Sequence, residues 1–211
     1  CAGFHQYNFN SKSGKRFILL DLDHRDKLLS SEINIIDKQT ISGSRVSHAW
    51  AEEQFFHFYM ELDIPYQKAR TFMKNGRHKL LLIFPKGTEQ INIKVGMSHV
   101  SEEGAKLNVQ TELPDWNFEA AKARVQAKWK AELSKIKFTS TDTEVVKNFY
   151  TALYHSYLSP NLSSDVDGKY RYGDMIHQLA EGDYDNYTVF SLWDTFRAAH
   201  PLYTLTQVER T

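Results

Sequence analysis

Apolar and polar residues alternate along the first half of the chain. At residues 91–98 large apolar side chains occupy every second position, and the same period recurs at residues 56–62 and 17–22. A period of two is typical of β-strands with one buried and one exposed face. In residues 91–98 this pattern predicts an exposed face formed by Asn92, Lys94, Gly96 and Ser98. Up to about residue 112 we therefore predict antiparallel strands packed as a β-sandwich.

Turn-forming residues divide these strands. Asn75-Gly76 lies between two strand-like runs and predicts a hairpin turn. Pro65 and the run Pro85-Lys86-Gly87 predict strand ends, because proline cannot donate a hydrogen bond to a sheet.

The period becomes helical in the second half of the chain. Apolar residues recur every three or four positions from Phe118 to Ile136, which predicts one long helix with a narrow apolar stripe. We expect a second helix to begin at Thr141, because Thr141 and Glu144 have the spacing of a capping box. This helix must end before Pro160.

The segment Asn186–His200 has the strongest helical pattern. We predict a single amphipathic helix that Pro201 stops at His200. Its buried stripe would consist of Val189, Leu192, Phe196 and Ala199. The neighbouring flank would consist of Phe190, Trp193, Arg197 and His200, with Asp194 between them.

Trp193, Asp194 and Arg197 have the chemistry of a sugar-binding wall. An indole covers the apolar face of a pyranose, and a carboxylate accepts hydrogen bonds from two hydroxyls. The same spacing also fits a simpler arrangement, in which Asp194 and Arg197 pair with each other on the helix surface. The spacing leaves both interpretations open.

Other acidic clusters favour a structural interpretation. Inverting glycosidases need two carboxyl groups on either side of the bond that they cleave. Asp165 and Asp167 stand beside Gly168, however, and this composition predicts a turn. The acidic residues between Asp21 and Asp26 crowd a strand end, where solvation explains them better than a bound cation.

The histidines show no metal-ligand spacing, so we predict no metal site within this chain. His155 and His200 are expected at the C-terminal ends of helices, where a protonated imidazole is favoured by the helix dipole. That expectation competes with a role for either residue in a site.

Composition narrows the possible partners. The chain has 211 residues with 26 Lys and Arg against 26 Asp and Glu, so its formal net charge is zero. Nucleic acids and anionic membranes need an excess of positive charge, which argues against both. No apolar run is long enough to span a membrane. The single cysteine, Cys1, excludes an internal disulfide.

Several motifs together resemble glycoside hydrolase family 92, the calcium-dependent exo-acting α-mannosidases. The most specific is Tyr187-Thr-Val-Phe-Ser-Leu-Trp-Asp-Thr-Phe-Arg197, followed by Ala-Ala-His-Pro. Further motifs in the same order are Ile18–His24, His48–Ala51, Phe149–His155, Ser159–Ser163 and Asp165–Arg171. The resemblance spans nearly the whole chain.

The resemblance implies a fold and an activity. The fold is α+β and multidomain, an antiparallel β-sandwich followed by the first helices of an (α/α)6 barrel. The expected parts are 1–112 within the sandwich, 113–140 as a linker helix region and 141–211 as the start of the catalytic barrel. The activity is calcium-assisted removal of terminal α-linked mannose from glycans, with inversion and a preference for α-1,2 linkages.

The resemblance also implies roles for individual residues. Trp193 and Asp194 correspond to the pocket that holds the terminal mannose, and Arg197 would orient Asp194. The catalytic carboxyl groups and the Ca²⁺ ligands are expected beyond Thr211, so the segment alone would be inactive. The compartment would be the bacterial periplasm or the cell exterior. Cys1 begins a stretch that resembles an internal strand, which favours a longer parent protein over a lipid-modified first residue.

One alternative belongs to a different functional class. A non-catalytic carbohydrate-binding or interaction module, built on the sandwich, would also explain the aromatic content of 13%. A β-rich core would explain many of the same aromatic residues.

Overall fold

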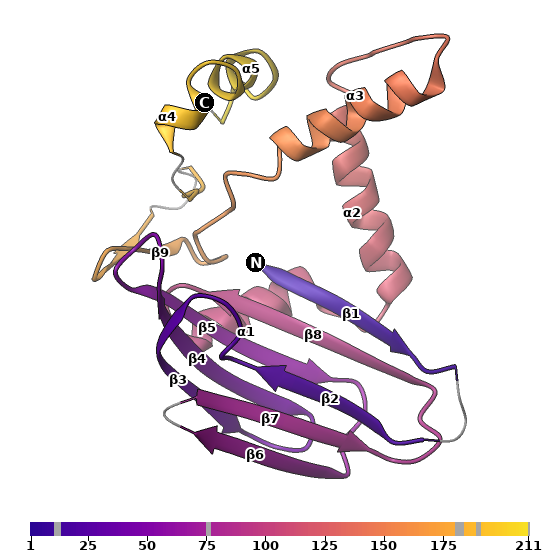
Figure 1. Cartoon of the computed structure of the whole chain (residues 1–211), viewed down its shortest axis with the longest axis vertical. Coiled ribbons are helices and arrows are strands. Elements are labelled where there is room, and N and C mark those ends of the chain that lie inside the picture. The colour runs from indigo at the N-terminus through magenta and orange to yellow at the C-terminus, as the bar shows by residue number, and fades with distance from the viewer. Residues whose placement is uncertain (11–13, 75–76, 180–183, 189–190, 211) are drawn as a thin grey trace. The chain divides into compact units, whose positions relative to one another are not determined.

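The computed structural model describes residues 1–10, 14–74, 77–179, 184–188 and 191–210. Contacts divide the chain into two compact units (Figure 1). The first, the β-unit, comprises Cys1–Phe118 and Ser163–Asn186. The second, the helical unit, comprises Glu119–Leu162 and Tyr187–Thr211. The predicted division at residues 112 and 140 stays a prediction.

The β-unit is built on two antiparallel sheets, as the alternating pattern predicted. The larger has the order β1-β8-β5-β4-β3 and the smaller has the order β2-β7-β6 (Figure 1). The strands are β1 (Ala2–Asn8), β2 (Arg16–Asp21), β3 (Lys27–Ile35), β4 (Thr40–His48), β5 (Gln54–Leu62), β6 (Lys68–Lys74), β7 (Arg77–Phe84) and β8 (Gln90–Ser98).

The hydrophobic core combines residues from both sheets. Its buried members include Ile41 and Leu62 from the larger sheet and Leu80 and Leu82 from the smaller one. Ile18 and Leu20 of β2 also pack against it, whereas Phe17 and Leu19 face outwards and are more than half exposed. The period of two therefore separates the two faces of this strand.

The pattern was wrong about the central strand β8. Asn92, Lys94, Gly96 and Ser98 are all buried rather than exposed. The main reason is helix α1 (Glu102–Glu112), which packs against β8, whereas Asn92 donates a hydrogen bond to Asp63. A Cβ on Gly96 would lie 1.9 Å from the carbonyl oxygen of Ala105 in α1, so the glycine allows this close approach.

Helix α1 itself was not predicted, because residues up to 112 were expected to be extended. Ser101 caps it, and the Ser101 hydroxyl accepts a hydrogen bond from the amide of Gly104 at 3.0 Å. The buried residues of the helix are Gly104, Ala105, Asn108 and Val109. Because most of these side chains are small or polar, they leave no hydrophobic stripe in the sequence.

Strand ends agree with the proline positions. β5 ends at Leu62, shortly before Pro65, and β7 ends at Phe84, directly before Pro85. Lys74 of β6 pairs with Arg77 of β7 in antiparallel register. The hairpin predicted at Asn75-Gly76 lies outside the described residues.

The helices α2 (Phe118–Leu133) and α3 (Thr143–Ser156) agree only approximately with their predicted bounds. α2 ends before Ile136, which was expected to belong to it. The predicted capping box at Thr141 is wrong, since Asp142 is the N-cap and its Oδ1 accepts from the amide of Glu144 at 2.9 Å.

The single helix predicted for Asn186–His200 is wrong. The segment instead contains a short helix α4 (Leu192–Thr195), a turn, and a helix α5 (Ala199–Thr206). Pro201 does not stop a helix but lies in the first turn of α5. Proline is tolerated there because amides of the first turn have no partner within the helix. Val189 and Phe190 lie outside the described residues.

Between α3 and α4 the chain returns to the β-unit and forms the hairpin of β9 (Lys169–Tyr172) and β10 (Met175–Gln178). Among the described residues, none of the helices combines the length and the apolar character that crossing a membrane requires.

Candidate functional site

The candidate sugar-binding residues lie in and directly after α4. Trp193 and Asp194 belong to the helix, and Arg197 lies in the turn that follows. All three side chains are exposed, and the Trp193 side chain has 86% of its surface accessible. An indole this exposed is uncommon in a folded protein and is available to a ligand.

The surface pair between Asp194 and Arg197, one of the two interpretations left open by their spacing, is not formed. The ion pairs within the described part of the chain include none between these residues. The Arg197 guanidinium instead lies 5.3 Å from the centre of the Phe196 ring. Arg197 therefore does not orient Asp194 in this structure, and the substrate-binding roles of Trp193, Asp194 and Arg197 stay predictions.

The helical unit also contains an aromatic groove with a volume of about 790 Å³. Trp129 of α2, Tyr157 after α3 and Tyr203 of α5 line it, together with His200. The Tyr203 hydroxyl donates to the carbonyl oxygens of Ser156 and Ser159 at 2.6 and 3.1 Å. Burial raises the pKa of Tyr203, with a smaller contribution from Tyr157, so this hydroxyl stays protonated.

His200 lies at the second position of α5, so its predicted place at a helix C-terminus is wrong. His155 does lie in the last turn of α3, as predicted. His200 packs edge-on against Tyr203 with ring centres 6.0 Å apart. Its neighbourhood is therefore the aromatic groove.

A polar cluster joins α2 to the end of α5. Glu132 accepts hydrogen bonds from Gln207 Nε2 and Lys135 Nζ, each at 2.8 Å, and lies 3.4 Å from Arg210. Partial burial disfavours the charged carboxylate, but these hydrogen bonds and the positive charges outweigh it. They lower the pKa of Glu132 below its ordinary value of 4.5.

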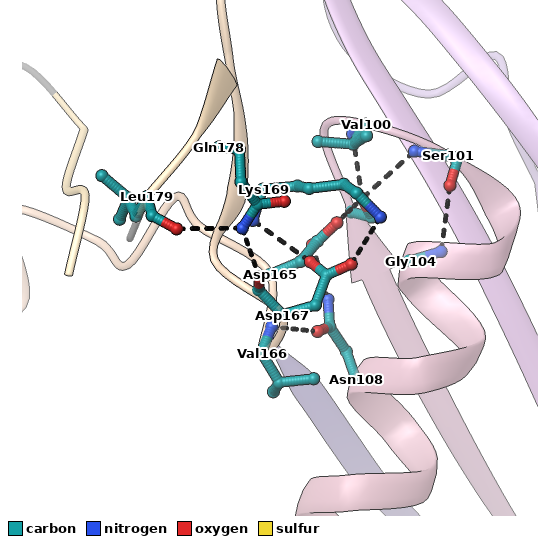
Figure 2. Close-up of polar contacts among 11 residues, drawn as sticks. Val100, Ser101, Gly104, Asn108, Asp165, Val166, Asp167, Lys169, Gln178 and Leu179 are labelled. Carbon is teal, nitrogen blue, oxygen red and sulfur yellow. Dashed lines mark hydrogen bonds and ion pairs between the residues drawn. The ribbon is translucent and has the colours of Figure 1, made fainter. Parts of the chain in front are cut away.

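Among the described residues, the most deeply buried acid lies in the β-unit, at the start of the predicted turn. Asp165 is 5% exposed, and its carboxylate contacts β8 and α1 (Figure 2). Oδ2 accepts from the hydroxyl of Ser98 at 2.6 Å, and Oδ1 accepts from Asn108 Nδ2 at 2.7 Å. No local sequence pattern indicates these contacts, because Ser98 and Asn108 lie far from Asp165 along the chain.

The turn interpretation of this motif is confirmed. The amide of Gly168 donates to the Asp165 carbonyl at 2.9 Å, and Gly168 has a φ of +81°. Asp167 lies 2.7 Å from the Lys169 ammonium. Partial burial works against its charge, yet the hydrogen bond from Lys169 prevails and lowers the pKa of Asp167. Both carboxylates therefore have structural partners in the fold.

The strand end near Asp21 is likewise explained by its own contacts. Asp21 Oδ2 lies 2.8 Å from the Lys79 ammonium, and Oδ1 accepts from the amide of Asp23 at 2.9 Å. Across the described ranges, no group of three or more His, Cys, Asp or Glu side chains could hold a metal ion. No cluster of acidic side chains that could bind Ca²⁺ is therefore present among these residues.

Comparison with known families and structures gives consistent matches. Residues 1–98 match the N-terminal domain of glycosyl hydrolase family 92, and residues 104–211 match the catalytic domain of the same family. A family GH92 α-mannosidase from Bacteroides thetaiotaomicron is 29% identical, with a TM-score of 0.84. That alignment covers 96% of this chain and 30% of the mannosidase. The same mannosidase is also known in complex with mannoimidazole.

More distant relatives agree. A GH92 inverting mannosidase from the same bacterium is 22% identical to this chain. The alignment covers 96% of this chain and 29% of that mannosidase, and its TM-score of 0.79 shows a shared fold. A relative from Arthroderma benhamiae, described as an uncharacterized secreted glycosidase, is 25% identical over 130 residues. These are 60% of this chain and 16% of that protein. The chain thus spans about 30% of the solved mannosidases. The likeness confirms the predicted fold class, a β-sandwich followed by helices of the barrel.

Proposed function

Because the chain belongs to glycoside hydrolase family 92, we propose that it is part of an exo-acting α-mannosidase that removes terminal α-linked mannose from glycans with inversion. The main support is that the two family domains match residues 1–98 and 104–211, which leaves little of the chain unassigned. An α-1,2 linkage is the preferred substrate in this proposal.

The chain contributes the substrate-binding part of the site rather than the catalytic carboxyls. Trp193 would stack on the apolar face of the terminal mannose, and Asp194 would accept hydrogen bonds from its hydroxyls. Both side chains are exposed, so a ligand can reach them. Arg197 would have to turn from Phe196 to orient Asp194 when sugar binds.

The acid and base are assigned to the part of the enzyme beyond Thr211. The turn carboxylates do not meet the requirement, since Asp165 is buried and Asp167 pairs with Lys169. The Ca²⁺ of the proposed enzyme would be bound there as well, because the residues described here include no group of three or more His, Cys, Asp or Glu side chains that could hold a metal ion. We place the enzyme in the periplasm or outside the cell, in line with the secreted relative.

The proposal is tested by the products of the full-length enzyme. It should release single mannose residues from the non-reducing ends of α-mannosides, and EDTA should abolish that release. Chromatography of the products over time measures both. Oligosaccharides from internal cleavage, or full activity in excess EDTA, would contradict the proposal.

A non-catalytic binding module would give a different result in this assay. A module would bind mannosides without releasing mannose, even as a full-length protein. Calorimetric titration with an α-mannoside, run beside the product assay, separates the two functions. The match of residues 104–211 to a catalytic domain favours the enzyme.

A further inference from the structure

Asp165 is a buried carboxylate whose partners are neutral. Its Oδ2 accepts from Ser98 Oγ at 2.6 Å and its Oδ1 from Asn108 Nδ2 at 2.7 Å. Ser98 is 4% exposed and Asn108 is fully buried. Within the described part of the chain, no ion pair involves Asp165. A buried charge is costly, so the structure relies on these hydrogen bonds to hold it.

The surrounding bonds require a carboxylate at this position. Asn108 is fixed, because its Nδ2 also donates to the Met97 carbonyl at 2.8 Å and its Oδ1 accepts from the Val166 amide at 2.9 Å. The Ser98 hydroxyl already accepts from the amides of Val100 and Ser101, so its hydrogen is left for Asp165. Both partners therefore present donors, and only an acceptor on both sides satisfies them.

Space around the carboxylate is equally restricted. A Cβ on Gly104 would lie 2.3 Å from Asp165 Oδ2 and 2.9 Å from Ser98 Oγ. Gly104 lies in the first turn of α1, next to the positive end of the helix dipole. The first turn of α1 thus packs directly against the carboxylate, and any side chain at position 104 would displace the carboxylate of Asp165.

These contacts fasten a segment that leads to the candidate sugar-binding residues. The chain enters the β-unit at Ser163 and leaves it at Asn186. Its two ends are joined, since the amides of Ser163 and Ser164 donate to the Asn186 carbonyl at 2.7 and 3.2 Å. The Asn186 amide donates to the Ser164 hydroxyl at 3.3 Å. Fixing Asp165 therefore also fixes Asn186, from which the chain continues to Trp193.

We propose that Asp165, held by Ser98 and Asn108, is a positioning residue for substrate binding. These three residues form a latch that sets where the segment leading to Trp193 and Asp194 begins. Opening the latch would weaken binding of the terminal sugar without changing the groups that carry out the chemical step. The proposal rests on the function proposed above, since it needs Trp193 and Asp194 to contact the sugar.

The test compares three variants of the full-length mannosidase. Asp165→Asn places an amide donor against a donor and opens the latch. Gly104→Ala opens it from the other side and removes no hydrogen-bonding group. Asp167→Asn is the matched control, because it neutralises a carboxylate of the same turn that pairs with Lys169 at the surface.

Two readouts separate positioning from a general loss of stability. For both latch variants we expect KM for an aryl α-mannoside to rise about tenfold or more while kcat changes less than about threefold. Hydrogen exchange should become faster at the amides of Asn186 and Thr188 in the folded protein. Asp167→Asn should leave KM and exchange unchanged.

Each outcome decides the question. Wild-type KM in both latch variants would overturn the latch, as would a fall in melting temperature with KM and exchange unchanged. If Asp165→Asn does not fold, Gly104→Ala alone is judged by the same criteria. If the wild-type enzyme releases no mannose, the proposed function fails, and unchanged exchange at Asn186 would then also reject the latch.

Discussion

At the scale of single residues, the chain separates exposed chemistry from buried polarity. Trp193 and Asp194 face solvent, whereas Asp165, Asn108 and Ser98 form a closed set of hydrogen bonds. The exposed residues contribute little to the free energy of unfolding, so substituting them should leave the fold intact. The buried ones cannot, because a lost partner leaves an unsatisfied polar group.

Asp194→Ala in the full-length enzyme should reduce kcat/KM by about ten- to a hundredfold or somewhat more, the effect of losing one charge-assisted hydrogen bond to sugar. The melting temperature should stay nearly unchanged, because Asp194 is exposed and forms no ion pair with Arg197. Steady-state kinetics and thermal unfolding measure the two effects.

Glu144→Ala provides the control for Asp194→Ala. Glu144 is also an exposed helical carboxylate, 3.8 Å from Lys147, and its loss should affect neither quantity measurably. Wild-type kinetics for Asp194→Ala would reject the substrate-binding role of Asp194.

The sequence indicated the exposed residues but not the buried network. The motif around Trp193 is contiguous, so a resemblance could identify it. Asp165 reads as a turn residue, and its turn is confirmed, but Ser98 and Asn108 are brought to it only by the folded β-unit. Contacts between distant positions leave no local pattern in a single sequence.

At the scale of elements, the contact of α1 with β8 depends on a glycine. Gly96→Ala should destabilise the folded chain by about 1–3 kcal/mol or more, because the added Cβ would lie 1.9 Å from the Ala105 carbonyl oxygen. The backbone of α1 would have to move, since that atom is not a flexible side chain. Chemical denaturation of the 211-residue chain measures the loss.

Gly3→Ala is the matched control for this contact. Gly3 lies in β1, the strand next to β8, and a Cβ there would meet only the His5 imidazole at 3.4 Å. It should be neutral or stabilise the strand slightly, since glycine is unfavourable in strand interiors. Equal losses for the two variants would show that the α1 contact is not the cause.

The Glu132 cluster predicts how pH acts on the helical unit. Its folded pKa lies below the ordinary 4.5, so its contribution is fully present above about pH 4.5 and is lost as pH falls through the folded pKa. The difference in free energy of unfolding between wild type and Glu132→Gln should therefore shrink towards zero in acid. Denaturant unfolding at several pH values tests this, and a difference that grows as pH falls would contradict it.

Elements were predictable where a periodic hydrophobic pattern determines them. Strands of the sandwich alternate, and α2 repeats every three or four residues, so both were found. Helix α1 packs through Gly104, Ala105 and Asn108 and lacks that pattern. The segment after Asn186 shows a helical period, yet a turn separates α4 from α5. Hydrophobic spacing alone cannot locate such a break.

At the scale of the whole molecule, the two units differ in the size of their hydrophobic cores, because the buried hydrophobic residues described in the helical unit are Ala121, Leu153 and Tyr203 alone. The β-unit encloses a core between its sheets, with Ile41, Leu80 and Leu82 fully buried. The helical unit leaves Leu192, Phe196 and Val208 more than half exposed, and Leu205 is 80% exposed. The solved mannosidases are more than three times longer than the aligned part, so further helices are available to cover such residues in them.

This contrast predicts the behaviour of residues 1–211 expressed alone. The exposed residues of α4 and α5 form apolar surface that promotes association, so the chain should self-associate or bind a hydrophobic dye. It should not hydrolyse mannosides, because the proposed acid and base lie elsewhere. Light scattering, dye fluorescence and an aryl-mannoside assay measure these properties.

Replacing Leu205 and Val208 with Ser should reduce association. The same change at Phe17 and Leu19, which are exposed on the sandwich, serves as the control. A dye-negative monomer would instead support a self-contained module, and hydrolysis by the segment would reject the placement of the catalytic carboxyls.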